Sequence, residues 1–151
     1  MVGGVIVAAT LPRLPVVLAT HFDAVGTPNA WSSHAGYVTV LVVTGLLLPL
    51  AIVRMVAWFG VVRPEWLNVP YRTYWLEPAR RAEGLRRILS HMWWLACWMA
   101  AFVIGIHLVL VQAHQTVPPL LPTGPFLGVV AAFLAGLAIW IAAFYRVLRP
   151  R

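Results

Sequence analysis

Long apolar stretches alternate with shorter polar segments along the chain, and this alternation predicts membrane-spanning helices. Three stretches, residues 36–59, 92–112 and 126–145, contain Arg54 as their only formal charge. A bilayer core needs about 20 helical residues, each rising about 1.5 Å. We therefore expect three transmembrane helices, with the long Arg54 side chain reaching toward the nearest membrane surface.

A fourth, shorter span is expected at about residues 2–19. Its apolar part, residues 1–11, covers only about half a bilayer as a helix, and Pro12, Arg13 and Pro15 follow. It is either a short tilted span or part of a longer one. The predicted fold class is an all-α membrane protein, a four-helix bundle that forms one domain over residues 1–151.

Two segments between the spans have structure of their own. We expect residues 20–35 to form an outer cap, and residues 60–91 to form a cytoplasmic loop. In that loop Pro78 suits the first turn of a helix, and apolar residues then recur at helical spacing up to Met92. This pattern predicts an amphipathic helix that continues into the third span, with its basic face against anionic lipid headgroups.

The charge pattern predicts how the chain is oriented. The chain has 62% hydrophobic residues and a net charge of +7, and all eleven of its basic residues are arginines. Six arginines lie in residues 61–90 and three in the C-terminal tail, and cytoplasmic loops are enriched in such residues. The expected C-terminus is therefore cytoplasmic, and the expected partners include membrane lipids but not nucleic acid.

Small residues recur every four positions in two of the spans. They are Gly124, Gly128, Ala132 and Gly136 in the last span, and Cys97, Ala101 and Gly105 in the span before it. Such faces allow two helix backbones to approach closely. We expect these two helices to pack as an antiparallel hairpin, and most tryptophans to lie at the membrane boundaries.

Four of the five histidines fall on the outer side in this topology. His21 and His34 precede the first long span, while His107 and His114 lie seven residues apart on one helical face. Together with Asp23 they are candidates for a zinc or copper site, although no pair has the spacing of a known metal motif. Because that spacing is missing, we expect interfacial or hydrogen-bonded structural histidines, with the metal site and a tetrapyrrole ligand through His107 as alternatives.

No catalytic arrangement emerges from the polar residues. Three of the four acidic residues, Glu65, Glu77 and Glu83, lie on the side opposite Asp23. The chain also lacks a glycine-rich phosphate loop and a nucleophile elbow. We therefore expect a protein that is not an enzyme and has no cofactor.

Two motifs resemble a known family. The segment from Leu14 to Trp31 follows the pattern LPxxxxxHFxxxGxPxxW, and the segment from Asn68 to Arg81 follows NxPxxxYWLxPxRR. Both patterns are similar to those of an uncharacterised bacterial membrane-protein domain family, related to the N-terminal part of the sporulation-delaying toxin immunity protein. The resemblance implies a multi-pass protein of the bacterial inner membrane.

The leading functional hypothesis is a non-enzymatic accessory subunit of a larger membrane complex, which acts through protein contacts. Sensing of, or immunity to, a membrane-active peptide is the first alternative, and metal binding at the outer histidines is the second. The candidate partner-binding residues are His21, Phe22, Asp23, Trp31, Tyr74, Trp75, Gly124, Gly128 and Gly136.

Overall fold

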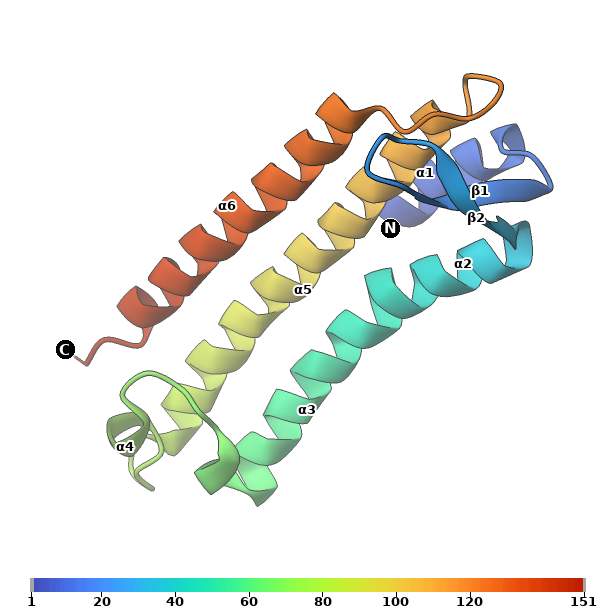
Figure 1. Ribbon diagram of the computed structural model, residues 1–151. Coiled ribbons are helices and arrows are strands. Elements are labelled where there is room, and N and C mark those ends of the chain that lie inside the picture. Colours follow the sequence, from blue (N-terminus) through green and yellow to red (C-terminus); the bar gives the residue numbers. More distant parts are fainter. Residues whose placement is uncertain (1, 151) are drawn as a thin grey trace.

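The computed structural model describes residues 2–150 and consists mainly of long helices (Figure 1). Its helices and strands are α1 (Val2–Thr10), β1 (Val17–Phe22), β2 (Pro28–Ser33), α2 (His34–Val42), α3 (Leu48–Val62), α4 (Arg72–Trp75), α5 (Arg81–Ala113) and α6 (Thr123–Val147). The structure also has short 3₁₀ turns at Leu11–Arg13 and Pro64–Trp66, and a π-helical segment at Val43–Leu47.

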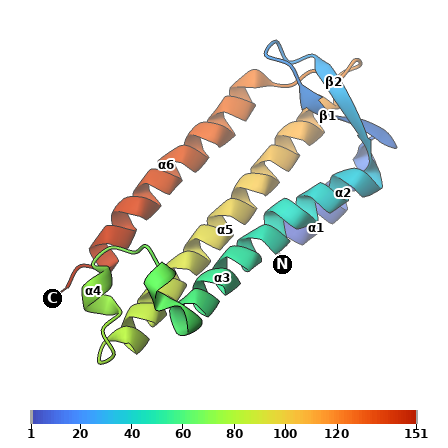
Figure 2. The same ribbon diagram turned by 60° about the horizontal axis from the view of Figure 1, so that its bottom comes forward.

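Three helical rods are long and apolar enough to cross a membrane: His34–Val62, Arg81–Ala113 and Thr123–Val147. The first rod joins α2, the π-helical segment and α3 into one continuous helix. In Figures 1 and 2, α5 lies between α3 and α6. The three expected long helices are thus confirmed; the first and last extend two or three residues beyond each expected bound, and the middle one begins 11 residues before its expected bound.

The predicted amphipathic helix and third span form a single helix, α5, of 33 residues. The chain turns at residues 76–80, and the helix begins at Arg81, three residues after Pro78. At about 1.5 Å per residue α5 is about 50 Å long, which exceeds a bilayer core of about 30 Å. Its first turns therefore extend beyond the apolar part of the bundle.

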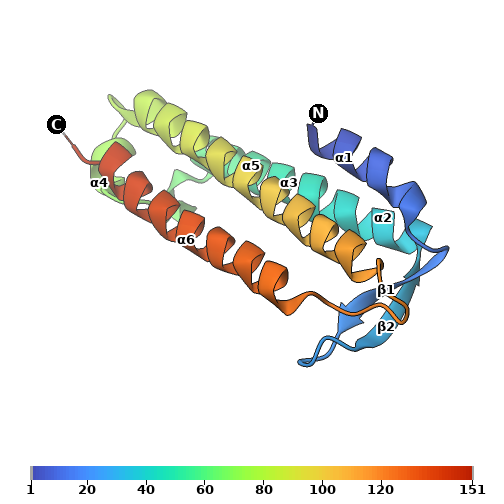
Figure 3. The same cartoon turned by 90° about the horizontal axis from the view of Figure 1, so that it is seen from above.

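The N-terminal segment differs from the expectation. Helix α1 ends at Thr10, and residues 17–19, expected to belong to the short span, are part of strand β1. Pro12 and Pro15 explain the break, since proline lacks the N–H that a continuing helix requires. Figure 3 shows α1 beside α2 and α5, and Gly3 faces the Ile104 side chain of α5.

The expected outer cap is a β-hairpin, which the purely helical prediction did not include. Strands β1 and β2 pair antiparallel, with Val17 opposite Ser33 and Phe22 opposite Pro28. The first long helix begins directly after the hairpin, because the Ser33 side chain accepts a hydrogen bond from the backbone N–H of Gly36. The hairpin and the linker of residues 114–122 lie together, and we call this the hairpin end (Figure 2).

The opposite end of the bundle carries most of the arginines, and we call it the arginine end. Here the Arg81 guanidinium donates hydrogen bonds to the carbonyl oxygens of Gly60 and Val61, at 2.8 and 2.7 Å. These bonds satisfy carbonyl groups that the end of α3 leaves without a helical partner. They join the end of α3 to the start of α5.

Candidate functional site

The hairpin end is held in place by His114 at the end of α5. Its Nδ1 donates to the carbonyl oxygen of Leu110 at 2.9 Å, so that Nε2 is free to accept from the Ala19 backbone N–H at 3.0 Å. The Nδ1 bond thus orients the ring on α5, and the Nε2 bond attaches strand β1 to it. His114 acts as a structural clamp.

Two further histidines at this end also have hydrogen-bond partners. His34 Nε2 donates to the carbonyl oxygen of Leu14 at 3.1 Å, and His21 Nδ1 lies 2.9 Å from Asn29 Oδ1 across the hairpin. His21 is exposed, whereas His34 is half-buried. These bonds stabilise the hairpin and its junction with the first long helix.

His107 is fully buried and connects three helices. Its Nδ1 lies 2.7 Å from the Tyr37 hydroxyl of α2, and its Nε2 lies 2.6 Å from Thr10 Oγ1 of α1. The Thr10 hydroxyl also donates to the Ile6 carbonyl oxygen at 2.7 Å, and hence must accept from His107. The Tyr37 hydroxyl is then the donor to His107 Nδ1.

These contacts bear directly on the predicted metal candidates. Among residues 2–150, no group of three or more histidine, cysteine or acidic side chains is arranged to hold a metal ion. Four of the five candidates, His21, His34, His107 and His114, make the separate bonds described above. The geometry therefore lends no support to the metal-binding alternative.

Asp23, the fifth metal candidate, shapes the hairpin turn. Its Oδ1 accepts hydrogen bonds from the backbone N–H groups of Val25 and Thr27, at 3.0 and 2.8 Å. Gly26 follows with a positive φ of 87°, a conformation that glycine adopts without steric cost. The Leu121 N–H donates to the Gly26 carbonyl oxygen at 3.0 Å, which attaches the proline-rich linker to the turn.

The two aromatic residues of the outer motif differ in exposure. Phe22 is half-buried and, with His21 and Asp23, lines a cavity of about 210 Å³ between the hairpin, α5 and α6. Trp31 is 51% exposed and belongs to strand β2. Of the outer partner-binding candidates, Trp31 offers the largest exposed apolar side chain.

The inner motif is mostly part of the core. Trp75 is 5% exposed, and its indole N–H donates to the carbonyl oxygen of Leu148 after α6. Tyr74 is half-buried and meets Trp75 edge to face, with ring centroids 5.0 Å apart. The Trp75 ring therefore has almost no free surface in this chain, and the partner contact expected for it stays a prediction.

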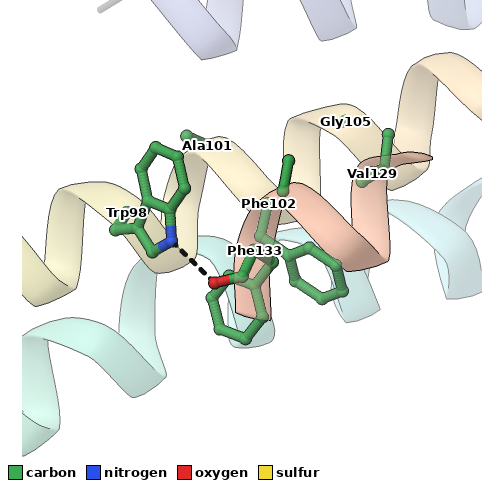
Figure 4. A pocket seen from close by; sticks show the side chains of 7 residues that line it. Trp98, Ala101, Phe102, Gly105, Val129 and Phe133 are labelled. Atoms are coloured by element: carbon green, nitrogen blue, oxygen red, sulfur yellow. Dashed lines mark hydrogen bonds between the residues drawn. The ribbon is translucent and has the colours of Figure 1, made fainter. Parts of the chain in front are cut away.

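Helices α5 and α6 pack through an aromatic and small-residue interface (Figure 4). The Trp98 indole N–H donates to the carbonyl oxygen of Phe133 at 3.2 Å, and the Phe102 and Phe133 rings stack with centroids 4.3 Å apart. Gly105 lies against Val129, and a Cβ on Gly136 would come within 2.3 Å of the Trp98 ring. Gly136 therefore faces α5 and is covered by it.

The other two glycines of the predicted α6 face are oriented differently. A Cβ added to Gly124 or Gly128 would meet no atom of residues 2–150 within 4 Å. The prediction placed these glycines on one face with Ala132 and Gly136, but a spacing of four residues drifts by about 40° per step around a helix with 3.6 residues per turn. The drift turns Gly136 toward α5 and leaves Gly124 and Gly128 uncovered.

One buried residue, His91, was absent from the predicted sites. Its Nε2 donates to the carbonyl oxygen of Trp140 at 3.0 Å, and the Trp140 indole N–H donates back to the His91 carbonyl oxygen at 3.0 Å. The His91 ring also stacks on Phe144, with centroids 5.1 Å apart. His91 lies three residues after Ile88, on the apolar face of the predicted amphipathic helix. This position could have indicated that it is buried.

Comparisons of the chain with protein-family models, with curated proteins and with solved structures give no match. The resemblance of the two motifs to a bacterial membrane-protein family therefore stays a prediction.

Proposed function

We propose that this chain is an integral membrane protein without enzymatic activity, and that it acts as an accessory subunit by packing α6 against a helix of another membrane protein. The membrane location is supported by the three rods of sufficient length and apolar character. The proposed location is the bacterial cytoplasmic membrane, with the arginine end and the C-terminus in the cytoplasm, since arginine is concentrated at that end.

One feature of α6 carries the subunit proposal. Six small residues, all exposed, occur at alternating intervals of four and three residues and so share one face, which we call the α6 stripe: Gly124, Gly128, Ala131, Ala135, Ala138 and Ala142. Intervals of four and three average 3.5 residues, close to one helical turn. The stripe lies opposite the face of Val129, Phe133 and Gly136 that packs on α5.

This arrangement favours a second helix at the stripe. The stripe runs for 18 residue intervals, about 27 Å, which is most of the thickness of a bilayer core. Helices in lipid associate chiefly through close backbone contact, and small side chains permit that contact. Larger side chains such as Leu134 and Ile139 flank the stripe and are exposed, so a partner helix would lie in a shallow apolar groove.

The test is mild detergent extraction of the tagged protein from its native membrane, followed by crosslinking and mass spectrometry. We expect a defined partner at fixed stoichiometry. An Ala131→Leu, Ala135→Leu double variant should reduce partner recovery about tenfold or more, because the bulky side chains keep the two backbones apart.

The matched control is Ala51→Leu, which adds the same bulk at an exposed site on α3. It should leave recovery unchanged. Recovery of a lone monomer from the unmodified protein, or equal loss in the stripe and control variants, would contradict the proposal. The sensor or immunity-like alternative stays a prediction that rests on the motif resemblance alone.

A further inference from the structure

A cavity of about 270 Å³ opens at the arginine end, between α4, the start of α5 and the segment after α6. Its lining consists of three arginines, one carboxylate, two aromatic residues and an alanine: Arg80, Arg87, Arg149, Glu83, Tyr74, Trp75 and Ala79. Arg149 comes from the segment after α6, 69 residues after Arg80 in the sequence. Folding therefore gathers three guanidinium groups around one hollow.

Two of these arginines are held in position by aromatic rings. The guanidinium carbon of Arg80 lies 4.3 Å from the centroid of the Tyr74 ring, and that of Arg87 lies 4.8 Å from the centroid of a Trp75 ring. Cations at this distance are attracted to the face of an aromatic ring. Their side chains are thus oriented before any ligand arrives.

The carboxylates near the cavity do not balance its positive charge. Arg80 pairs with Glu77, and Glu83 is shared by Arg86 and Arg87. The lining itself has three arginines and one glutamate, Glu83, which leaves a net charge of +2; Arg86 and Glu77 lie outside the lining and carry opposite charges. Within residues 2–150, none of the four ion pairs includes Arg149, so its guanidinium has no carboxylate partner in that part of the chain.

The cavity also lies next to the apolar surface of the bundle. Arg149 follows two residues after the end of α6, where Tyr145 and Val147 are 57% and 40% exposed. Apolar side chains thus extend along α6 to the edge of the cavity. A ligand with a charged group in the cavity would have room for hydrocarbon chains along this surface.

We infer that this cavity binds the phosphate headgroup of an anionic phospholipid. Guanidinium groups donate paired hydrogen bonds that match the geometry of phosphate oxygens. The aromatic side chains suit the level at which headgroups meet the acyl chains. The inference rests on the proposed membrane location, and it assigns a defined lipid site rather than a general attraction between a basic surface and lipid.

The experiment is native mass spectrometry of the full chain in a neutral detergent, titrated with phosphatidylglycerol or with phosphatidylcholine. We expect one phosphatidylglycerol adduct to form at least fivefold more tightly than the phosphatidylcholine adduct. Arg149→Gln and Arg80→Gln should each weaken phosphatidylglycerol binding about fivefold. Arg149 is exposed, so its replacement should leave the far-UV circular dichroism spectrum unchanged.

The matched control is Arg146→Gln, which removes the same charge from an exposed position three residues before Arg149 and outside the cavity. Its affinity for phosphatidylglycerol should change less than twofold. Equal losses in Arg146→Gln and Arg149→Gln would overturn the inference, because they would show general charge attraction. Equal binding of the two lipids would also overturn it.

Competition with inorganic phosphate tests whether the cavity binds a lipid or a free anion. Millimolar phosphate should not displace the phosphatidylglycerol adduct, since it lacks acyl chains to contact α6. Displacement would overturn the assignment to a lipid. Fractionation of native membranes tests the proposed membrane location separately. If the protein fractionates with membranes but shows no preference between the two lipids, the lipid site is rejected and the membrane location is kept.

Discussion

At the scale of single residues, the fully buried His107 determines how the hairpin end is assembled. Its two ring nitrogens bond to side chains that are 97 and 70 residues away in the sequence, Thr10 on α1 and Tyr37 on α2. A buried polar group without a partner costs about 1–3 kcal/mol, so each bond is needed in the apolar interior. The three residues form one unit that holds α1 and α2 against α5.

Replacing Tyr37 by phenylalanine tests this unit. The change removes only the hydroxyl and leaves His107 Nδ1 without its donor, so we expect a loss of about 1–2 kcal/mol in the free energy of unfolding. Thermal unfolding of the purified protein in detergent provides the measurement. Tyr145→Phe is the control, because Tyr145 is 57% exposed, and it should change stability by less than about 0.5 kcal/mol. Equal effects of the two variants would contradict the assignment.

At the scale of elements, two glycines of helix α6, Gly128 and Gly136, have opposite environments. Gly136 is covered by the Trp98 ring of α5, whereas Gly128 has no atom within 4 Å of an added Cβ. Both could be recognised in the sequence as small residues. Their environments could not, because they depend on which face of α6 meets α5.

This contrast gives two alanine substitutions with opposite expected effects. Gly136→Ala should lower the free energy of unfolding by about 1–3 kcal/mol, since its Cβ would displace the Trp98 ring and break the hydrogen bond to Phe133. Gly128→Ala should be neutral or stabilise by up to about 1 kcal/mol through helix propensity. The measurement is the free energy of unfolding of both variants in the same detergent. A change of the same sign in both variants would contradict the packing of Gly136 against α5.

At the scale of the whole molecule, charge divides the bundle into two ends. The arginine end carries the long loop and the tail after α6, whereas the hairpin end has Arg13 and Asp23 as its formal charges. This asymmetry predicts that the hairpin end is translocated across the membrane and the arginine end is retained.

Cysteine labelling tests that orientation. In a Cys97→Ser background, Gln115→Cys places a thiol in the exposed linker of the hairpin end, and Thr73→Cys places one at an exposed position of the short helix α4, at the arginine end. A membrane-impermeant maleimide should label the first in intact cells and the second only after permeabilisation. The reverse pattern would show that the proposed orientation is inverted.

Local patterns predicted the long helices well but did not predict the hydrogen-bond partners of the histidines. Residues 36–59 and 126–145 were identified because hydropathy over about 20 residues is a property of one continuous segment. The grouping of His21, His34, His107 and His114 assumed that residues on one side of the bundle converge. In the structure each histidine instead satisfies a nearby backbone or side-chain group, since buried polar groups require hydrogen bonds.

The sequence by itself determined the three long helices, the extension of α5 toward its N-terminus and the separation of charge between the two ends. These features depend on residues that are neighbours along the chain. Only the tertiary structure decided that residues 17–33 form a hairpin, that His107 joins three helices, that Gly136 is covered and that Arg149 meets Arg80 and Arg87. These features depend on packing between segments far apart in the sequence, which hydropathy and spacing within one segment do not encode.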